Sequence, residues 1–125
     1  MGKERILFID DEEVQCRSGR HLLERLGYDV TTRTDSLEAL EKFRAQPDAF
    51  DLVITDQSMP SMTGIQLAEK LMHIRPDIPI ILCTGFSEVV DGKEAKALGI
   101  REFMMKPFSV RQLAEAIRRV LGGRD

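Results

Sequence analysis

Several residue types are scarce in this chain of 125 residues, and their scarcity excludes whole classes of protein. It has no tryptophan and only two cysteines, Cys16 and Cys83, which lie too far apart for a CxxC metal or redox motif. We interpret both as small buried apolar residues in a reducing cytoplasm. Acidic and basic residues are interleaved with a net charge of −3, so we expect no direct contact with nucleic acid.

Long apolar runs are also missing. No run approaches the ~20 residues that cross a bilayer, and the first residues, Met-Gly-Lys-Glu-Arg, resemble neither a signal peptide nor a myristoylation site. We therefore expect a cytoplasmic domain without membrane contact. The length suits one domain over residues 1–125 that has its own core and needs no disulfide or structural metal.

Five short, mostly apolar runs alternate with amphipathic stretches along the chain. The expected strands are Arg5–Ile9, Tyr28–Thr32, Leu52–Thr55, Ile80–Cys83 and Glu102–Met105. Nearly continuous apolar runs are typical of strands buried on both faces of a parallel sheet. The alternation predicts an α/β fold, a five-stranded parallel sheet with five helices on its two faces. Of two plausible strand orders, the flavodoxin-like order 2-1-3-4-5 fits five strands best.

Apolar periodicity and capping signals indicate the helices. The first is expected to bury one stripe, made of Val14, Leu22, Leu23 and Leu26. Three later helices begin at predicted capping boxes. These are Asp35 with Glu38, Thr63 with Gln66, and Ser109 with Gln112. The fourth helix, roughly Ser87–Leu98, has a thin apolar stripe.

Polar residues follow four of the five strands. Asp10 and Asp11 follow the first strand and Asp56 follows the third. Thr84 follows the fourth strand and Lys106 the fifth. In the order 2-1-3-4-5 these four strands are neighbours, and ligands bind at their carboxyl ends. The pattern therefore predicts one site that contains carboxylates, a hydroxyl and an ammonium group.

Clustered carboxylates point to a cation and to phosphoryl chemistry. Their mutual repulsion is relieved by a hard divalent ion such as Mg²⁺, which prefers oxygen ligands and also binds phosphate oxygens. A carboxylate can act as a nucleophile toward phosphorus, and a lysine and a hydroxyl can stabilise the transferring group. The alternative interpretation for Asp10, Asp11 and Glu12 is capping of the first helix.

From about Arg5 to Leu121, the chain resembles the receiver domain of a two-component response regulator, of the CheY-like superfamily. The matching stretches are Asp10-Asp11, Asp56 in VITDQSMPSMTG, Thr84 in IILCTG, and Lys106-Pro107 in FMMKP. The resemblance implies Mg²⁺-dependent phosphoryl transfer from a partner phosphohistidine to Asp56. The partner would be a histidine kinase or a histidine phosphotransfer domain.

The resemblance also implies a metal site and two catalytic groups. Mg²⁺ or Mn²⁺ would be bound by Asp10, Asp11, Asp56 and the backbone carbonyl of Ser58. Lys106 and Thr84 would contact the phosphoryl group. Beyond its own phosphorylation and dephosphorylation, the domain would catalyse no reaction and so would not be an enzyme.

Further positions would carry the response. Thr84 and Phe103 would act as the switch, and a cis peptide bond would precede Pro107. Ser58 and Phe86 would tune the lifetime of the phosphorylated state. The surface formed by helix 4, strand 5 and helix 5 would bind a downstream protein or a second copy of the chain.

Other functions stay open from the sequence. An aspartyl phosphohydrolase of the haloacid-dehalogenase type would need an acid where Ser58 stands. A flavin or nucleotide carrier would need a phosphate loop where the acidic DDEE stretch lies. A receiver-like interaction module need not be phosphorylated. The stretches TDQSMPSMTG and IRPDIPIILCTGFSE resemble those of receivers in hybrid sensor histidine kinases. We therefore expect this chain to come from such a kinase and not from a stand-alone regulator.

Overall fold

The computed structural model describes residues 4–85 and 96–122. The strands are β1 (Arg5–Ile9), β2 (Asp29–Arg33), β3 (Leu52–Asp56), β4 (Ile80–Thr84) and β5 (Glu102–Met105). The helices are α1 (Glu13–Arg25), α2 (Ser36–Ala45), the 3-10 helix η1 (Pro47–Ala49), α3 (Gly64–Ile74) and α5 (Val110–Leu121). All five strands are parallel and lie in the order β2-β1-β3-β4-β5, which confirms the predicted α/β class and strand order.

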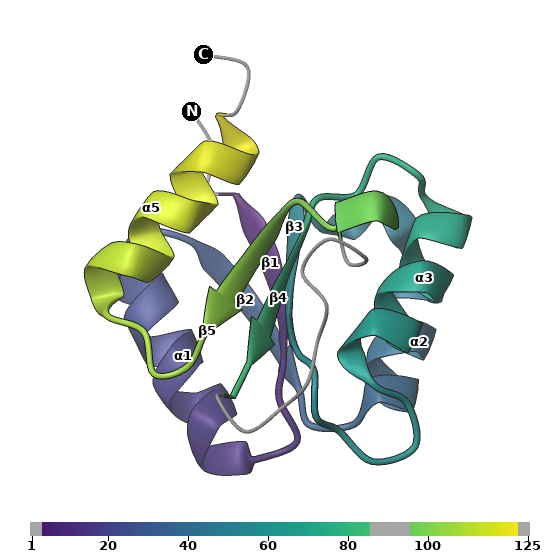
Figure 1. Ribbon diagram of the computed structural model, residues 1–125, viewed down its shortest axis with the longest axis horizontal. Coiled ribbons are helices and arrows are strands. Elements are labelled where there is room, and N and C mark those ends of the chain that lie inside the picture. Colours follow the sequence, from purple (N-terminus) through teal and green to yellow (C-terminus); the bar gives the residue numbers. More distant parts are fainter. Residues whose placement is uncertain (1–3, 86–95, 123–125) are drawn as a thin grey trace.

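The sheet is covered on both faces. Helices α1 and α5 lie on one face and α2 and α3 on the other (Figure 1). Successive side chains of a strand point to opposite faces, so Leu7 and Ile9 join the core under α2 and α3 while Ile6 and Phe8 join the core under α1 and α5. Burial on both faces explains why the strands lack an apolar-polar alternation.

The predicted fourth helix, Ser87–Leu98, lies largely outside the described residues. Within residues 4–85 and 96–122 the structure contains four α-helices longer than two turns. In the same ranges no helix is long and apolar enough to cross a bilayer.

The apolar stripe predicted for α1 is partly wrong. Val14 and Leu26 are exposed, and Leu23 is fully buried. The buried face instead begins at Cys16 and continues through Gly19, where a Cβ would lie 2.5 Å from Cζ of Phe8. Because Gly19 has no side chain, the Phe8 ring packs directly against the backbone of α1, and no large apolar side chain is needed at this position.

Capping begins three helices, as predicted, with one difference. Thr63 and Ser109 form capping boxes with Gln66 and Gln112 at the starts of α3 and α5. At α2 the Asp35 carboxylate accepts a hydrogen bond from the backbone N–H of Leu37, two residues on, so the bond differs from the predicted box.

Candidate functional site

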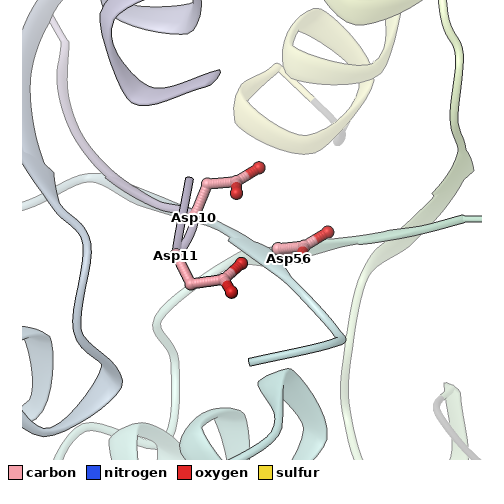
Figure 2. A group of neighbouring side chains, drawn as sticks. All are labelled: Asp10, Asp11 and Asp56. Carbon is pink, nitrogen blue, oxygen red and sulfur yellow. The ribbon is translucent and has the colours of Figure 1, made fainter. Parts of the chain in front are cut away.

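Three aspartates gather where β1 and β3 end. Asp10 and Asp11 follow β1, and Asp56 is the last residue of β3 (Figure 2). One carboxylate oxygen from each lies within 4.8 Å of the others. Asp10 and Asp56 are buried, whereas Asp11 is exposed. The cluster is thus two buried carboxylates with a third on the solvent side.

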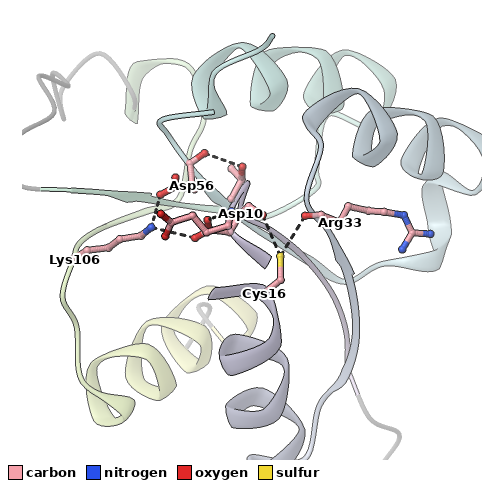
Figure 3. Close-up of polar contacts among 7 residues, drawn as sticks. Asp10, Cys16, Arg33, Asp56 and Lys106 are labelled. Atoms are coloured by element: carbon pink, nitrogen blue, oxygen red, sulfur yellow. Dashed lines mark hydrogen bonds and ion pairs between the residues drawn. The ribbon is translucent and has the colours of Figure 1, made fainter. Parts of the chain in front are cut away.

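Lys106 reaches this cluster from the chain just after β5 (Figure 3). Its Nζ lies 2.7 Å from Oδ1 of Asp56 and 3.1 Å from Oδ2 of Asp10. Burial alone lowers the pKa of Lys106, but hydrogen bonds and charge attraction from Asp56 and Asp10 outweigh it and raise that pKa above its usual range. The ammonium therefore stays charged and neutralises part of the carboxylate cluster.

The turn after β1 holds Asp10 in place. Its backbone N–H donates to the carbonyl of Arg33 at the end of β2, and its Oδ1 accepts from the N–H of Glu12. The buried thiol of Cys16 donates to the carbonyl oxygens of Asp10 and Arg33 (Figure 3). The interpretation of Cys16 as a buried residue is confirmed, but its contact with the turn was not predicted.

Capping of α1 accounts for only part of the acidic run after β1, since Glu13 lies in the first turn, where an acid favours the helix dipole. Helix α1 begins at Glu13, and the Glu12 side chain makes no capping hydrogen bond. The Asp10 carboxylate is turned toward Lys106 and Asp56 as well as toward the turn. The ion pairs of Lys106 with Asp10 and Asp56 explain how these two carboxylates can be buried side by side.

Gly64 lets α3 approach the end of β3 closely. A Cβ on this residue would lie 2.3 Å from the carbonyl oxygen of Asp56 and 2.7 Å from Cδ1 of Leu82. Only a hydrogen atom fits in this space, so glycine sets the distance between α3 and Asp56. This role was not predicted, because a glycine after a capping threonine carries no sequence signal of a contact eight residues away.

The other predicted site residues lie around this centre. Thr84 is buried at the end of β4, and its carbonyl accepts from the N–H of Lys106. Phe103 on β5 is partly buried against the core under α2 and α3. The peptide bond between Lys106 and Pro107 is cis. Ser58 is exposed in the loop after β3. Phe86 lies outside the described residues.

The chain matches a known family of signalling domains. Residues 6–118 match the response regulator receiver domain. The chain belongs to the response regulator receiver family. This receiver is a phosphoacceptor signalling domain of a two-component system, with an acidic pocket at the carboxyl ends of its strands. Receiver domains interact with histidine kinases and with downstream effectors.

Curated relatives include regulators and a kinase. The receiver is 35% identical over 118 residues to the response regulator receiver protein CpdR of Brucella abortus, covering 94% of this chain and 97% of CpdR. It is 35% identical to the alkaline phosphatase synthesis transcriptional regulatory protein PhoP of Bacillus subtilis, covering 94% of this chain and 48% of PhoP. The sensor kinase CckA of Brucella abortus is 32% identical, with 99% and 13% coverage. The chain thus spans about half the length of PhoP and a small part of CckA.

A solved structure has the same fold. The crystal structure of a response regulator receiver domain protein from Clostridium thermocellum superposes with a TM-score of 0.91 at 30% identity. The superposition covers 97% of this chain and 96% of that chain.

The aspartate cluster fits a hard divalent ion. Oxygens bound to one Mg²⁺ at about 2.1 Å lie roughly 3–4 Å apart, and one oxygen from each of the three carboxylates lies within 4.8 Å of the others, close to that range. Receiver domains bind Mg²⁺ at an acidic site of this kind, and this cluster could hold one.

Proposed function

We propose that Asp56 accepts a phosphoryl group from a phosphohistidine on a partner protein, with Mg²⁺ or Mn²⁺ bound beside it. The observation that carries the proposal is the convergence of Asp10, Asp11, Asp56 and Lys106 from the ends of three strands. Three carboxylates gathered there repel one another, and the Lys106 ammonium and a bound cation relieve that repulsion.

The transfer is an in-line displacement at phosphorus. An oxygen of the Asp56 carboxylate forms the new P–O bond while the P–N bond to the donor imidazole breaks. The imidazole nitrogen leaves with that electron pair and takes up a proton. Lys106, already 2.7 Å from Asp56, stabilises the charge on the phosphoryl oxygens.

In this proposal the metal is bound by the side chains of Asp11 and Asp56 and the backbone carbonyl of Ser58, and by Asp10 either directly or through water. Bound there, the ion supplies positive charge to the phosphoryl oxygens. Asp11 is exposed and lies on the side from which an ion enters.

The response follows from Thr84 and Phe103. The Thr84 hydroxyl donates to a phosphoryl oxygen, and Phe103, which is only partly buried now, moves further inward. These movements change the surface of helix 4, β5 and α5, where a downstream protein or a second copy binds. Ser58 and Phe86 tune the lifetime of the phosphorylated state, Phe86 by restricting the attack of water.

The donor is a histidine kinase or a histidine phosphotransfer domain in the cytoplasm. We further propose that the chain comes from a hybrid sensor histidine kinase, which the likeness to CckA supports. The likeness to CpdR and PhoP supports a separate regulator instead. The sequence of the flanking gene distinguishes the two origins, and the chemistry at Asp56 is the same in both.

Incubation with acetyl phosphate and Mg²⁺, followed by intact mass spectrometry, tests the proposal. We expect wild type and the exposed control variant Asp48→Asn to gain one phosphoryl group, and Asp56→Asn to gain none. Chelation of the metal should abolish the gain. A phosphoryl adduct on Asp56→Asn at the wild-type level would remove Asp56 from this role.

A further inference from the structure

Gln57, directly after Asp56, uses three polar groups to hold its surroundings. Its N–H donates to the carbonyl of Cys83 on β4 at 2.9 Å. Its carbonyl accepts from the N–H of Gly64 at 3.0 Å, and its side-chain Oε1 accepts from the N–H of Ile65 at 2.9 Å. Both of the last two bonds go to the first turn of α3. Gln57 therefore joins β4, the end of β3 and the start of α3.

These bonds complete the N-terminus of α3. The first four N–H groups of a helix have no partner within it. Those of Thr63 and Gln66 are satisfied by the capping box between these two residues. Those of Gly64 and Ile65 are satisfied by Gln57. One residue outside the helix thus supplies half of its capping, and that residue is bonded to Asp56.

We propose that Gln57 is a positioning residue for the phosphoacceptor, acting through its side-chain bond to Ile65. Two adjacent bonds fix the direction as well as the position of the first turn of α3 relative to the end of β3. The six-residue loop 58–63 begins and ends at this junction. The bond therefore holds the Ser58 carbonyl in register with the Asp56 carboxylate. This inference rests on the proposed metal and phosphoryl roles of those two groups.

Three variants separate positioning from stability. Gln57→Met has a similar length but no acceptor for the Ile65 N–H. Gln57→Glu keeps an acceptor oxygen within the same reach, so it should rescue the bond. Gln66→Met is the matched control, because it removes the acceptor of the Thr63 N–H at the same helix terminus without touching the residue beside Asp56.

Three measurements apply to each variant. These are hydrogen exchange of the Ile65 amide, Mg²⁺ affinity by calorimetry, and the rate of phosphorylation by acetyl phosphate at saturating Mg²⁺. In Gln57→Met, we expect Ile65 exchange to rise about tenfold, as for a lost hydrogen bond. We expect affinity and rate to fall about tenfold each, as when an outer partner of a metal site is removed.

The positioning role of Gln57 is tested by comparing all three variants. We expect Gln57→Glu to show wild-type exchange and rate, and Gln66→Met to lose thermal stability while keeping Mg²⁺ affinity and rate. Unchanged Ile65 exchange in Gln57→Met, or an equal loss of affinity in Gln66→Met, would overturn the positioning role. Absence of phosphorylation in wild type would instead refute the proposed function. Hydrogen exchange of the Ile65 amide and Mg²⁺ affinity would then still test the positioning role of Gln57.

Discussion

Individual residues at the strand ends differ in how well the sequence predicts them. Asp10 and Asp56 were predicted from the sequence because a carboxylate that follows an apolar strand lies at the edge where ligands bind. The contacts of Gln57 and Gly64 were not predicted, because they join residues seven or eight positions apart in the sequence. Such contacts depend on the distance between a strand and a helix, which residue types alone do not encode.

Lys106 is expected to stabilise the fold when no metal is bound. Lys106→Met removes the cation between Asp10 and Asp56 and leaves two buried carboxylates facing each other. We expect the free energy of unfolding in urea, with chelator present, to fall by about 2 kcal/mol. Excess Mg²⁺ should recover part of this loss. The exposed Arg111→Met is the control, and equal stability of both variants would contradict the account.

The buried thiol of Cys83 is expected to make the fold less stable in alkali. Burial raises the pKa of its thiol to about 12, above its value in the unfolded chain. The folded state therefore holds the proton more tightly, and this contribution is full below about pH 9 and is lost as the pH rises toward 12. We expect the stability of wild type to fall more steeply than that of Cys83→Ala, by about 1.4 kcal/mol per pH unit. Parallel pH profiles from urea unfolding would exclude this effect.

Among the elements, the strands were predicted within one residue at each end, whereas α1 was predicted less well. Continuous apolar runs mark buried strands clearly. In α1 the buried face uses Cys16 and Gly19, and apolar periodicity gives no weight to a glycine. Exposed Val14 and Leu26 fit the helical period by chance, so the stripe was displaced around the helix.

Helix α3 depends on a glycine at its first position. In Gly64→Ala, the new methyl group meets the backbone carbonyl of Asp56, which cannot move as a side chain can. We expect a loss of about 1–3 kcal/mol in the free energy of unfolding, although alanine favours helices. Gly122→Ala, at the exposed C-cap of α5, is the control and should change stability little. A Gly64→Ala protein as stable as wild type would show that α3 can shift freely.

For the whole molecule, the strand order was predictable because right-handed crossovers and five β-α units permit few arrangements. In that order β1, β3, β4 and β5 lie side by side, which assembles the site. The arrangement of the first turn of α3 against β3 was not predictable, since it rests on close packing at one glycine and one glutamine.

Binding of Mg²⁺ should stabilise the entire fold, because the site exists only in the folded state. At an ion concentration of about 100 times Kd, the free energy of unfolding should rise by about 2.7 kcal/mol in wild type. In Asp11→Asn the same concentration should give a much smaller rise, while stability without metal should not fall, because the change removes one of three mutually repelling carboxylates. Equal Mg²⁺ stabilisation of wild type and Asp11→Asn in thermal unfolding would remove Asp11 from the metal site.

The most direct test is to locate the phosphoryl group on the chain. After phosphorylation with Mg²⁺, borohydride reduces an aspartyl phosphate to homoserine, and peptide mass spectrometry identifies the converted residue. We expect conversion at Asp56 and at no other aspartate. Conversion at Asp10 or Asp11, or at none of the three, would contradict it.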